Sequence, residues 1–376
     1  VQYLFKTEVI DMARVGILGA GTWGMALARM LANSGHDVIV WSAVGREIDE
    51  LEKTHRQPNL PDMEVPESVR YTKNIEEACS QAEIIMFAVP SLYVRPTAAQ
   101  AAPFISDDQI VVNVGKGIEA DTLFSLTEVI SEESGKMGRH PAMVALSGPT
   151  HAEEVARDIP STIVSACEDR KAAEFVQQVF MNTCMRVYTN PDVMGVELCG
   201  AMKNIIALAS GIVAGLGYGD NTRAALLTRG MAEITRLGKA MGCREQTFAG
   251  LAGIGDLIVT ATSMHSRNNQ CGILIGQGYS PEEAVKKVGM VVEGINALPA
   301  AMHLSEHYGV EMPICEAVNG VVKEGVDPRE AVMELMVRDK KPEFSQTSDR
   351  DGEYGIDGDG IYYEGAFLHI EGGMMF

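Results

Sequence analysis

Hydrophobic and polar residues follow two different patterns along the 376 residues of this chain. Up to about residue 190, short apolar runs alternate with polar stretches of helical periodicity, of which Thr22–Asn33 is the first. The runs predict strands at Arg14–Leu18, Asp37–Trp41, Glu83–Val89, Gln109–Val114, Met143–Leu146, Ser161–Ser165 and Met185–Tyr188. Strands that alternate with helices imply crossover connections, so we expect a parallel sheet covered on both faces.

After Pro191 the pattern is helical almost throughout, up to about Val337. The two clearest helices are predicted at Val196–Leu216 and Thr222–Met241. Two more, at Pro281–Val288 and Pro328–Met336, begin with proline, which is favoured at a helix start. The fold class we predict is an α/β doubly wound (Rossmann-type) parallel sheet followed by an all-α domain.

The expected divisions are a 1–12 N-terminal extension, a dinucleotide-binding domain at 13–190, a helical substrate and catalytic domain at 191–340, and a tail at 341–376. The tail holds eight acidic residues between 342 and 376 against one basic residue, and it is rich in glycine. This composition predicts an acidic, disordered tail.

Composition excludes several classes of function. The net charge of −20 argues against a nucleic-acid partner, which needs basic patches. The sequence contains no uninterrupted run of about 18 apolar residues, so we predict no membrane span. Seven cysteines at irregular spacing are typical of reduced thiols, so we expect a cytoplasmic protein. Histidines and cysteines do not cluster at ligand spacing, so no metal site is predicted.

A glycine-rich turn, Gly19-Ala-Gly21-Thr-Trp-Gly24, lies between the first strand and the first helix. Gly19 permits the tight turn, Gly21 lets a pyrophosphate approach the backbone, and Gly24 allows close packing of helix on strand. The helix start supplies free N–H groups to the phosphates. An incidental glycine turn is the alternative, but the placement between strand and helix favours dinucleotide binding.

The second strand ends without the acidic residue that NAD-selective sites place on the ribose hydroxyls. Arg46 follows closely enough to meet a 2′-phosphate, which favours NADPH over NADH. A solvated residue at a helix start explains Arg46 equally well, so NADPH or NADH remains the expected coenzyme.

Two polar groups follow later strands, where α/β folds bind ligands. Lys116 stands between two glycines after Val114 and is a candidate ligand-binding residue. The alternative interpretation is a surface lysine in a flexible loop. The turn at 147–150 offers the Thr150 hydroxyl and backbone N–H groups to an oxyanion. The alternative interpretation is an ordinary Gly-Pro turn before a helix that Thr150 caps.

Lys203 lies on a predicted helix face that it shares with the small residues Cys199, Gly200 and Ala207. Partial burial on such a face would lower the lysine pKa toward the range useful for proton transfer. Asp256 is a candidate to hold this ammonium by a charged hydrogen bond. A purely structural ion pair is the alternative interpretation of Lys203 and Asp256.

The triplet Ser266-Arg267-Asn268 precedes a glycine-containing helix. With Ser266 as cap and Arg267 as a bidentate donor, the helix start predicts a phosphate cradle. An amine, a carboxylate and a guanidinium among small residues suit the reduction of a phosphorylated ketone.

Eight segments match one family: Gly19–Gly24, Val114–Gly117, Ser147–Thr150, Glu197–Asn204, Gly219–Ala225, Gly250–Asp256, Ser266–Asn268 and Val291–Gly294. Across roughly residues 13–340 the chain resembles the bacterial-type NAD(P)-dependent sn-glycerol-3-phosphate dehydrogenases. The resemblance implies reversible hydride transfer between NAD(P)H and dihydroxyacetone phosphate, giving sn-glycerol 3-phosphate for glycerophospholipid synthesis. We also expect a homodimer.

The resemblance further implies a role for single residues. Lys203 would transfer the proton, with Asp256 orienting it. The coenzyme would be contacted by Thr22, Trp23, Lys116, Ala152, Arg267, Val291 and Glu293. The substrate would be surrounded by Lys116, Gly148, Thr150, Lys203, Asp256, Ser266, Arg267 and Asn268, with Asn204 and Thr260 as additional contacts.

Three features depart from the family pattern, and they leave the fine fit of the substrate open. His151 stands where an aromatic residue, usually phenylalanine, is expected; Met264-His265 replaces a usual leucine; and the acidic tail lies outside the family's span. Two other functions stay open: a two-domain dehydrogenase for a carboxylate-bearing hydroxy acid, and a non-catalytic redox sensor that binds the dinucleotide.

Overall fold

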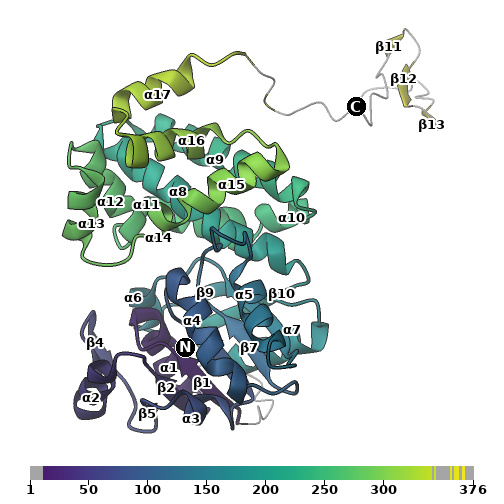
Figure 1. Ribbon diagram of the computed structural model, residues 1–376. Helices are drawn as coiled ribbons and strands as arrows, with labels where there is room; N and C mark the ends of the chain where they lie inside the picture. Colours follow the sequence, from purple (N-terminus) through teal and green to yellow (C-terminus); the bar gives the residue numbers. More distant parts are fainter. Residues whose placement is uncertain (1–11, 341–342, 344–355, 358–359, 364–365, 369–376) are drawn as a thin grey trace, which may run out of the picture. The chain divides into compact units, whose positions relative to one another are not determined.

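An eight-stranded sheet organises the first half of the chain. The computed structural model describes residues 12–340, 343, 356–357, 360–363 and 366–368. The strands of this sheet are neighbours in the order β5-β2-β1-β6-β7-β8-β9-β10 (Figure 1). In chain order they are β1 (Arg14–Leu18), β2 (Asp37–Trp41), β5 (Arg70–Thr72), β6 (Ile84–Phe87), β7 (Ile110–Asn113), β8 (Ala142–Ser147), β9 (Ser161–Ala166) and β10 (Met185–Asn190).

The strand order reverses at β1, which confirms the doubly wound α/β fold predicted from the sequence. β1 pairs in parallel with β2 on one side and with β6 on the other. In folds of this kind the ligand binds in the crevice outside the carboxyl ends of the strands where the order reverses. The ends of β1 and β6 therefore mark the crevice.

The two last strands differ from the predicted parallel sheet. β9 pairs antiparallel with β8, and β10 pairs in parallel with β9. The reason lies in the connection between β8 and β9, whose only helix is α6 (Ala152–Val155). A parallel crossover needs a helix that spans the length of a strand, and four helical residues cover only about 6 Å.

Alternate side chains of the strands enter two separate cores, one on each face of the sheet. In β1, Val15 and Ile17 join one core and Leu18 joins the other. The first core is covered by α1 (Thr22–Asn33), α6 and α7 (Arg170–Phe180). The second is covered by α3 (Ile75–Cys79), α4 (Val94–Ala101) and α5 (Leu126–Gly135). This alternation is what a sheet covered on both faces requires.

Smaller elements complete this part of the chain. They are α2 (Gly45–Thr54), the antiparallel pair β3 (Arg56–Gln57) and β4 (Leu60–Glu64), and the 3₁₀ turns η1 (Ser91–Tyr93) and η2 (Ala102–Phe104). η1 directly follows β6, so its first residue, Ser91, lies at the carboxyl end of the sheet.

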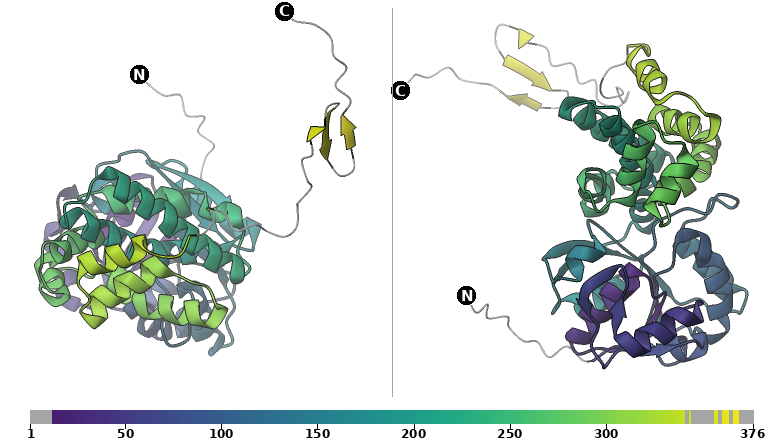
Figure 2. Two further views of the ribbon diagram at one scale, coloured as in Figure 1. Left: turned by 90° about the horizontal axis from the view of Figure 1, so that it is seen from above. Right: turned by 90° about the vertical axis from the view of Figure 1, so that its left-hand side faces the viewer.

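The helical half is built around α8 (Val193–Gly215), which is buried along most of its length. The other elements are α9 (Asp220–Ala240), α10 (Glu245–Phe248), the π-helical turn η3 (Leu251–Gly255), α11 (Asp256–Thr262), α12 (Arg267–Gly276), α13 (Pro281–Val288), α14 (Glu293–Asn296), α15 (Leu298–Tyr308), α16 (Pro313–Asn319), η4 (Gly320–Glu324) and α17 (Pro328–Met336). Both views of Figure 2 show these teal to yellow-green helices as one group. Helices α13 and α17 have the predicted bounds, and α8 begins three residues before its predicted start.

Glycines bring α8 and α12 into backbone contact. A Cβ atom at Gly211 would lie 2.1 Å from the carbonyl oxygen of Asn269, and one at Gly272 would lie 2.1 Å from that of Leu208. Gly215 and Gly276 repeat this arrangement one turn further along. The crossing therefore holds the start of α12 close to the middle of α8, where Lys203 stands.

Helix α8 is also long and apolar enough to cross a membrane, with a mean hydropathy of 1.5 over its most apolar window. However, 89% of that window is buried inside the protein. The segments Glu245–Thr262 and Arg267–Gly276 meet the same criterion only if taken together, across a bend of 50°. A buried core helix meets this criterion without any membrane, so these helices are weak support for a span.

The residues from Met336 to Phe376 form a separate unit. Its described strands are β11 (Ile356–Asp357), β12 (Gly360–Tyr363) and β13 (Ala366–Leu368), paired antiparallel in that order. The predicted disordered tail at 341–376 thus contains three short strands, and most of its other residues lie outside the described residues. Residues 1–11 of the predicted extension also lie outside them.

The close crossing of α8 and α12 generates a stability prediction. Gly272→Ala should lower the free energy of unfolding by about 2 kcal/mol or more, because the new methyl group would meet the Leu208 backbone and force the helices apart. Urea denaturation measures this loss. Gly135→Ala, at the end of α5, is the control: its nearest neighbour would be His140 Cε1 at 3.7 Å, so this variant should keep or gain stability. Equal stability of the two variants would contradict the predicted clash.

Candidate active site

The candidate site lies where loops leave the carboxyl ends of the central strands. These loops carry Gly19 after β1, Ser91 after β6, Lys116 after β7 and Gly148 after β8. Parallel strands end at the same edge of the sheet, so all four loops border the crevice.

The turn after β1 has the geometry that a dinucleotide pyrophosphate needs. Gly19 has φ +130°, and a Cβ there would lie 2.6 Å from the Ala88 carbonyl oxygen. A Cβ at Gly24 would lie 2.1 Å from the Gly19 oxygen, whereas one at Gly21 would meet nothing within 4 Å. Helix α1 starts after Gly21 without a side-chain cap, so its first N–H groups are free for an anion. These residues fit a dinucleotide.

Lys203 is buried in the middle of α8, with 3% of its surface exposed. Its Nζ donates to Asp256 Oδ1 at 2.7 Å and to Thr260 Oγ1. These bonds use two of the three ammonium hydrogens, and the third is available to a ligand. An amine held in this way can donate a proton in a defined direction.

Asp256 is positioned by the π-helical turn η3 and by the start of α11. A Cβ at Gly253 would lie 2.1 Å from the Phe248 carbonyl oxygen, so the turn depends on glycine there. π-Helical turns are rare and often occur at functional sites. Asp256 itself is 1% exposed and is the first residue of α11, where the helix dipole favours a negative charge.

The second oxygen of Asp256 binds Lys116 from the sheet half of the chain. Lys116 Nζ donates to Asp256 Oδ2 at 2.6 Å and to the Gly148 carbonyl oxygen at 3.2 Å. One carboxylate therefore holds two ammonium groups that are 87 residues apart in the sequence. We call Lys116, Asp256 and Lys203 the charge cluster. Its net charge is +1 when all three groups are ionised.

Burial shifts the pKa values of this cluster. Burial lowers the pKa of Lys203 to about 7, although the attraction of Asp256 partly opposes this, and Lys116 lowers it further. Burial alone would raise the pKa of Asp256, but the two ammonium groups outweigh it and the pKa is lowered. The carboxylate therefore stays ionised at neutral pH, while Lys203 can both give and take a proton.

The start of α12 is joined to α8 and α14 by asparagines. Ser266 caps α12 by accepting from Asn269 N at 3.2 Å. Asn268 Nδ2 donates to Asn204 Oδ1 at 2.9 Å, and Asn268 Oδ1 accepts from Gly294 N at 2.8 Å. Asn204 is the neighbour of Lys203, so the predicted phosphate cradle lies beside the charge cluster.

Glu293 reaches the opposite side of the crevice. Its carboxylate accepts from Ser91 N at 3.1 Å and from Ser91 Oγ at 2.6 Å. Ser91 belongs to the loop after β6, so this contact ties α14 to the carboxyl end of the sheet. The sequence pattern did not point to Ser91.

The other predicted site residues lie at the expected ends of helices and strands. Within the described part of the chain, no hydrogen bond joins them directly to the charge cluster. Arg267 and Arg46 are exposed, on the first turns of α12 and α2. The half-buried ones are Thr22 and Trp23 in α1, Thr150 before α6, Ala152 at its start, and Val291 before α14. Thr150 Oγ1 donates to the Gly148 carbonyl oxygen at 3.2 Å, on the loop that also binds Lys116.

The end of β2 has a more balanced charge than the sequence indicated. Glu47 Oε2 accepts from Ser42 Oγ at 2.7 Å, which brings a carboxylate next to the residue that follows the strand. Lys73, which pairs with Asp49 at 2.5 Å, adds a second cation near Arg46: a Cβ at the neighbouring Gly45 would lie 3.9 Å from its Nζ. The surroundings of the expected 2′-phosphate therefore contain both signs of charge.

The sequence analysis assigned no role to three other polar residues of this region. Glu197, on α8, is 5% exposed and binds Asn113 and Thr127. Ser147 Oγ and His151 Nε2 are buried and have no hydrogen-bond partner among the described residues. One available signal for Glu197 was that it is the sole acidic residue in the apolar helix sequence 193–215.

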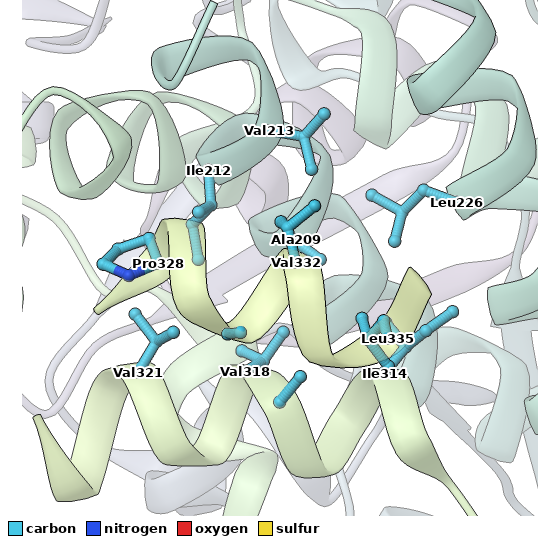
Figure 3. A pocket seen from close by; sticks show the side chains of 12 residues that line it. Ala209, Ile212, Val213, Leu226, Ile314, Val318, Val321, Pro328, Val332 and Leu335 are labelled. Carbon is cyan, nitrogen blue, oxygen red and sulfur yellow. The ribbon is translucent and has the colours of Figure 1, made fainter. Parts of the chain in front are cut away.

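The pocket shown in Figure 3 lies elsewhere in the helical half. Apolar side chains of α8, α9, α16, η4 and α17 line it, among them Ile212, Leu226 and Val332. With twelve apolar lining residues it offers no group to a phosphate. Within the described part of the chain, no group of three or more His, Cys, Asp and Glu side chains is arranged to hold a metal ion.

A dinucleotide cradle beside a buried lysine of lowered pKa is the arrangement of a dinucleotide-dependent dehydrogenase, in which an amine supplies the proton that accompanies a hydride. The family models for the N-terminus and the C-terminus of NAD-dependent glycerol-3-phosphate dehydrogenase match residues 14–173 and 192–333. The chain belongs to this family, which confirms the resemblance seen in the sequence.

Individual relatives agree with the family models. Glycerol-3-phosphate dehydrogenase (NAD(P)+) 2 of Lactobacillus delbrueckii subsp. bulgaricus is 64% identical over 89% of this chain and 100% of its own length. The glycerol-3-phosphate dehydrogenase (NAD(P)+) of Agathobacter rectalis is 51% identical over 89% of this chain and 98% of its own. The crystal structure of glycerol-3-phosphate dehydrogenase from Coxiella burnetii superposes with a TM-score of 0.83 at 34% identity, covering 87% of this chain and 99% of that one.

The buried charge cluster leads to a prediction about stability. Asp256→Asn should lower the free energy of unfolding by about 3–5 kcal/mol, because it leaves buried ammonium groups without their counter-charge. The loss should be larger at pH 6 than at pH 9. Below the Lys203 pKa of about 7 the wild-type ammonium is charged against the carboxylate, whereas the variant must bury an unbalanced charge or keep the amine neutral. Urea denaturation at the two pH values tests this, and an unchanged or pH-independent difference would contradict it.

Proposed function

We propose that this chain is an NAD(P)-dependent glycerol-3-phosphate dehydrogenase. It transfers hydride reversibly between NAD(P)H and the carbonyl carbon of dihydroxyacetone phosphate, giving sn-glycerol 3-phosphate. Membership of the family supports the activity, and the 64% identity with a glycerol-3-phosphate dehydrogenase over the full length of that relative supports the substrate. The observation that carries the chemistry is the buried contact of Lys203 with Asp256.

Lys203 is proposed to give its proton to the carbonyl oxygen of the substrate. When bound, the reduced nicotinamide supplies the hydride to the carbonyl carbon, so the C=O bond becomes a C–H and an O–H bond. A lysine of pKa about 7 can donate this proton near neutral pH and can accept it in the reverse direction. Its remaining N–H would also stabilise the negative charge that develops on the oxygen.

Asp256 and Lys116 are proposed to fix the position of Lys203 and to bind the substrate. Asp256 orients the Lys203 ammonium through its 2.7 Å contact. Lys116 retains one N–H beyond its bonds to Asp256 and Gly148, and that N–H faces no recorded partner among the described residues. A cluster of net charge +1 in a chain of net charge −20 gives a phosphorylated ketone a local attraction.

The phosphate is proposed to lie at the start of α12. Ser266, Arg267 and Asn268 provide a capped helix start, an exposed guanidinium and a side-chain amide there. Gly148, Thr150, Asn204 and Thr260 are proposed as further substrate contacts. Ser147 Oγ and His151 Nε2, which have no hydrogen-bond partner in the described part of the chain, are consistent with a polar ligand on this side.

The coenzyme is proposed to lie over the glycine turn Gly19–Gly24. Its phosphates would meet the free N–H groups at the start of α1. Thr22, Trp23, Lys116, Ala152, Arg267, Val291 and Glu293 are the proposed contacts. A contact of Glu293 with the coenzyme would share the carboxylate that accepts from Ser91.

The proposal also includes the domain organisation and the cellular role. The domains would be divided near residue 190, with the coenzyme on 13–190 and the catalytic residues on 191–340. We propose a cytoplasmic homodimer whose product feeds glycerophospholipid synthesis. Both NADH and NADPH serve members of this family, as the names of the relatives state.

The activity and the coenzyme preference can be tested together. Purified protein should oxidise NADPH and NADH in the presence of dihydroxyacetone phosphate, which is measured as loss of absorbance of the reduced nicotinamide. If Arg46 binds a 2′-phosphate, Arg46→Ala should raise the KM for NADPH by roughly ten- to a hundredfold and leave that for NADH unchanged, since one charged hydrogen bond contributes about 1.5–3 kcal/mol. Folded protein that oxidises neither coenzyme would refute the activity, and equal effects on both would remove Arg46 from coenzyme selection.

The pH dependence tests Lys203. For reduction, kcat/KM should fall as the pH rises through about 7, because the proton donor is lost; for oxidation it should rise over the same range. Lys203→Ala should lower kcat by at least about a hundredfold and abolish this pH dependence, while the Kd for the coenzyme changes little. Near-normal turnover of the variant, or an unchanged pH profile, would exclude Lys203 as the proton-transferring group.

A further inference from the structure

The mechanism leaves unexplained one buried acid on α8, Glu197. It is 5% exposed, yet it lies on the same helix as Lys203 and faces the sheet half of the chain. Its carboxylate accepts from Asn113 Nδ2 at 2.8 Å and from Thr127 N at 3.2 Å, and Thr127 Oγ1 also donates to it. Burying a carboxylate costs free energy that its hydrogen-bond donors must offset, so Glu197 and the segments that carry these donors are fixed relative to one another.

Glu197 binds both ends of the segment that carries Lys116. Asn113 is the last residue of β7, and Thr127 is the second residue of α5. The intervening segment, residues 114–125, leaves the sheet after Asn113 and closes on itself through an isolated antiparallel bridge between Ile118 and Ser125, just before α5 begins. One carboxylate therefore fixes the start and the end of this loop from a different half of the chain.

The Asn113 side chain links Glu197 to Gly115, the residue before Lys116. While its Nδ2 donates to Glu197, it also donates to the Gly115 carbonyl oxygen at 3.1 Å, and its Oδ1 accepts from Gly115 N at 3.0 Å. The peptide groups of Gly115 are thus held on both sides. The direction in which Lys116 leaves the backbone depends on this geometry.

The face of α8 that carries Glu197 also guides the Lys116 side chain. Gly200 lies one turn after Glu197, and a Cβ there would be 3.4 Å from Lys116 Cγ. Lys203 follows at the next turn and shares Asp256 with Lys116. One row on this helix face is therefore formed by Glu197, Gly200 and Lys203. Glu197 fixes the 114–125 loop, Gly200 leaves room for the aliphatic part of the Lys116 side chain, and Lys203 binds the Asp256 carboxylate that Lys116 also binds.

We propose that Glu197 is a positioning residue, which acts through Asn113 and the start of α5 to hold Lys116 at Asp256 and at the substrate. The kinetic part of this inference rests on the proposed reduction of dihydroxyacetone phosphate. The structural part, order of the 114–125 segment, does not depend on that reaction.

The test compares three variants of the full-length protein. Glu197→Leu removes the acceptor while keeping an apolar side chain of similar size. Glu197→Gln keeps Oε1 for Asn113 and Thr127 N, and its amide can donate to Thr127 Oγ1. Glu233→Leu is the matched control: Glu233 is a buried acid on α9 that accepts from Ile314 N at 2.9 Å and caps α16, away from Lys116.

Glu197→Leu should raise the KM for dihydroxyacetone phosphate by about tenfold or more and lower kcat, because a displacement of about 1 Å in a positioning group can cost about a hundredfold in rate. Glu197→Gln should stay within about threefold of the wild type. Glu233→Leu should lose thermal stability with an unchanged KM. Amide hydrogen exchange of residues 115–127 should accelerate in Glu197→Leu alone.

The two readouts separate the failure of this inference from the failure of the proposed function. Protein without reductase activity whose 115–127 amides exchange faster only in Glu197→Leu would keep the positioning role and refute the substrate. Wild-type exchange and KM in Glu197→Leu, or a KM increase matched by Glu233→Leu, would overturn the positioning role. If Glu197→Leu does not fold, Asn113→Ala replaces it. This variant removes the bonds of the Asn113 side chain to Glu197 and to the Gly115 peptide groups but leaves Glu197 bound to Thr127, and it should show the same exchange pattern and a raised KM.

Discussion

The arrangement of the site depends on a single carboxylate that is shared by two ammonium groups. Asp256 is almost fully buried, and each of its oxygens accepts from one lysine, at 2.7 Å from Lys203 and 2.6 Å from Lys116. Removing three charges from water is costly, and the attraction among them offsets this only when every remaining donor and acceptor is satisfied. This requirement explains why the surrounding elements are held so closely: Thr260 accepts a second bond from Lys203 and Gly148 a second bond from Lys116, which leaves one N–H of each lysine for a ligand.

Glycines allow these elements to approach closely at two places. The π-helical turn before Asp256 brings Gly253 against the Phe248 carbonyl, and the α8–α12 crossing brings Gly272 against that of Leu208. Side chains at these positions would move Asp256 away from Lys203, or the start of α12 away from Asn204. The glycine-rich sequence of the helical half, unfavourable for isolated helices, is therefore a consequence of the site it must build.

The sequence predicts those features that depend on local pattern. The apolar runs locate β1 and β2, helical periodicity locates α13 and α17, and the spacing of Gly19, Gly21 and Gly24 predicts the dinucleotide turn. Tertiary features are less accessible. The direction of β9 depends on how short α6 is, and the roles of Glu197 and Ser91 depend on partners 70 and 202 residues away. Lys203 and Asp256 could be paired from the sequence, but the sharing of Asp256 with Lys116 could not, because nothing in the spacing says which carboxylate a lysine will reach.

The balance of charge in the cluster also determines its chemistry. A second carboxylate would neutralise the cluster, raise the pKa of Lys203 and remove the attraction for an anionic ligand. Without any carboxylate, the two lysines would repel each other and the pKa of Lys203 would fall further. With one carboxylate for two lysines, the pKa of Lys203 is about 7, and the cluster carries one net positive charge while Lys203 is protonated. The ratio of two to one thus keeps Lys203 able to exchange a proton near neutral pH while the site stays attractive to phosphate, in a chain whose overall charge is strongly negative.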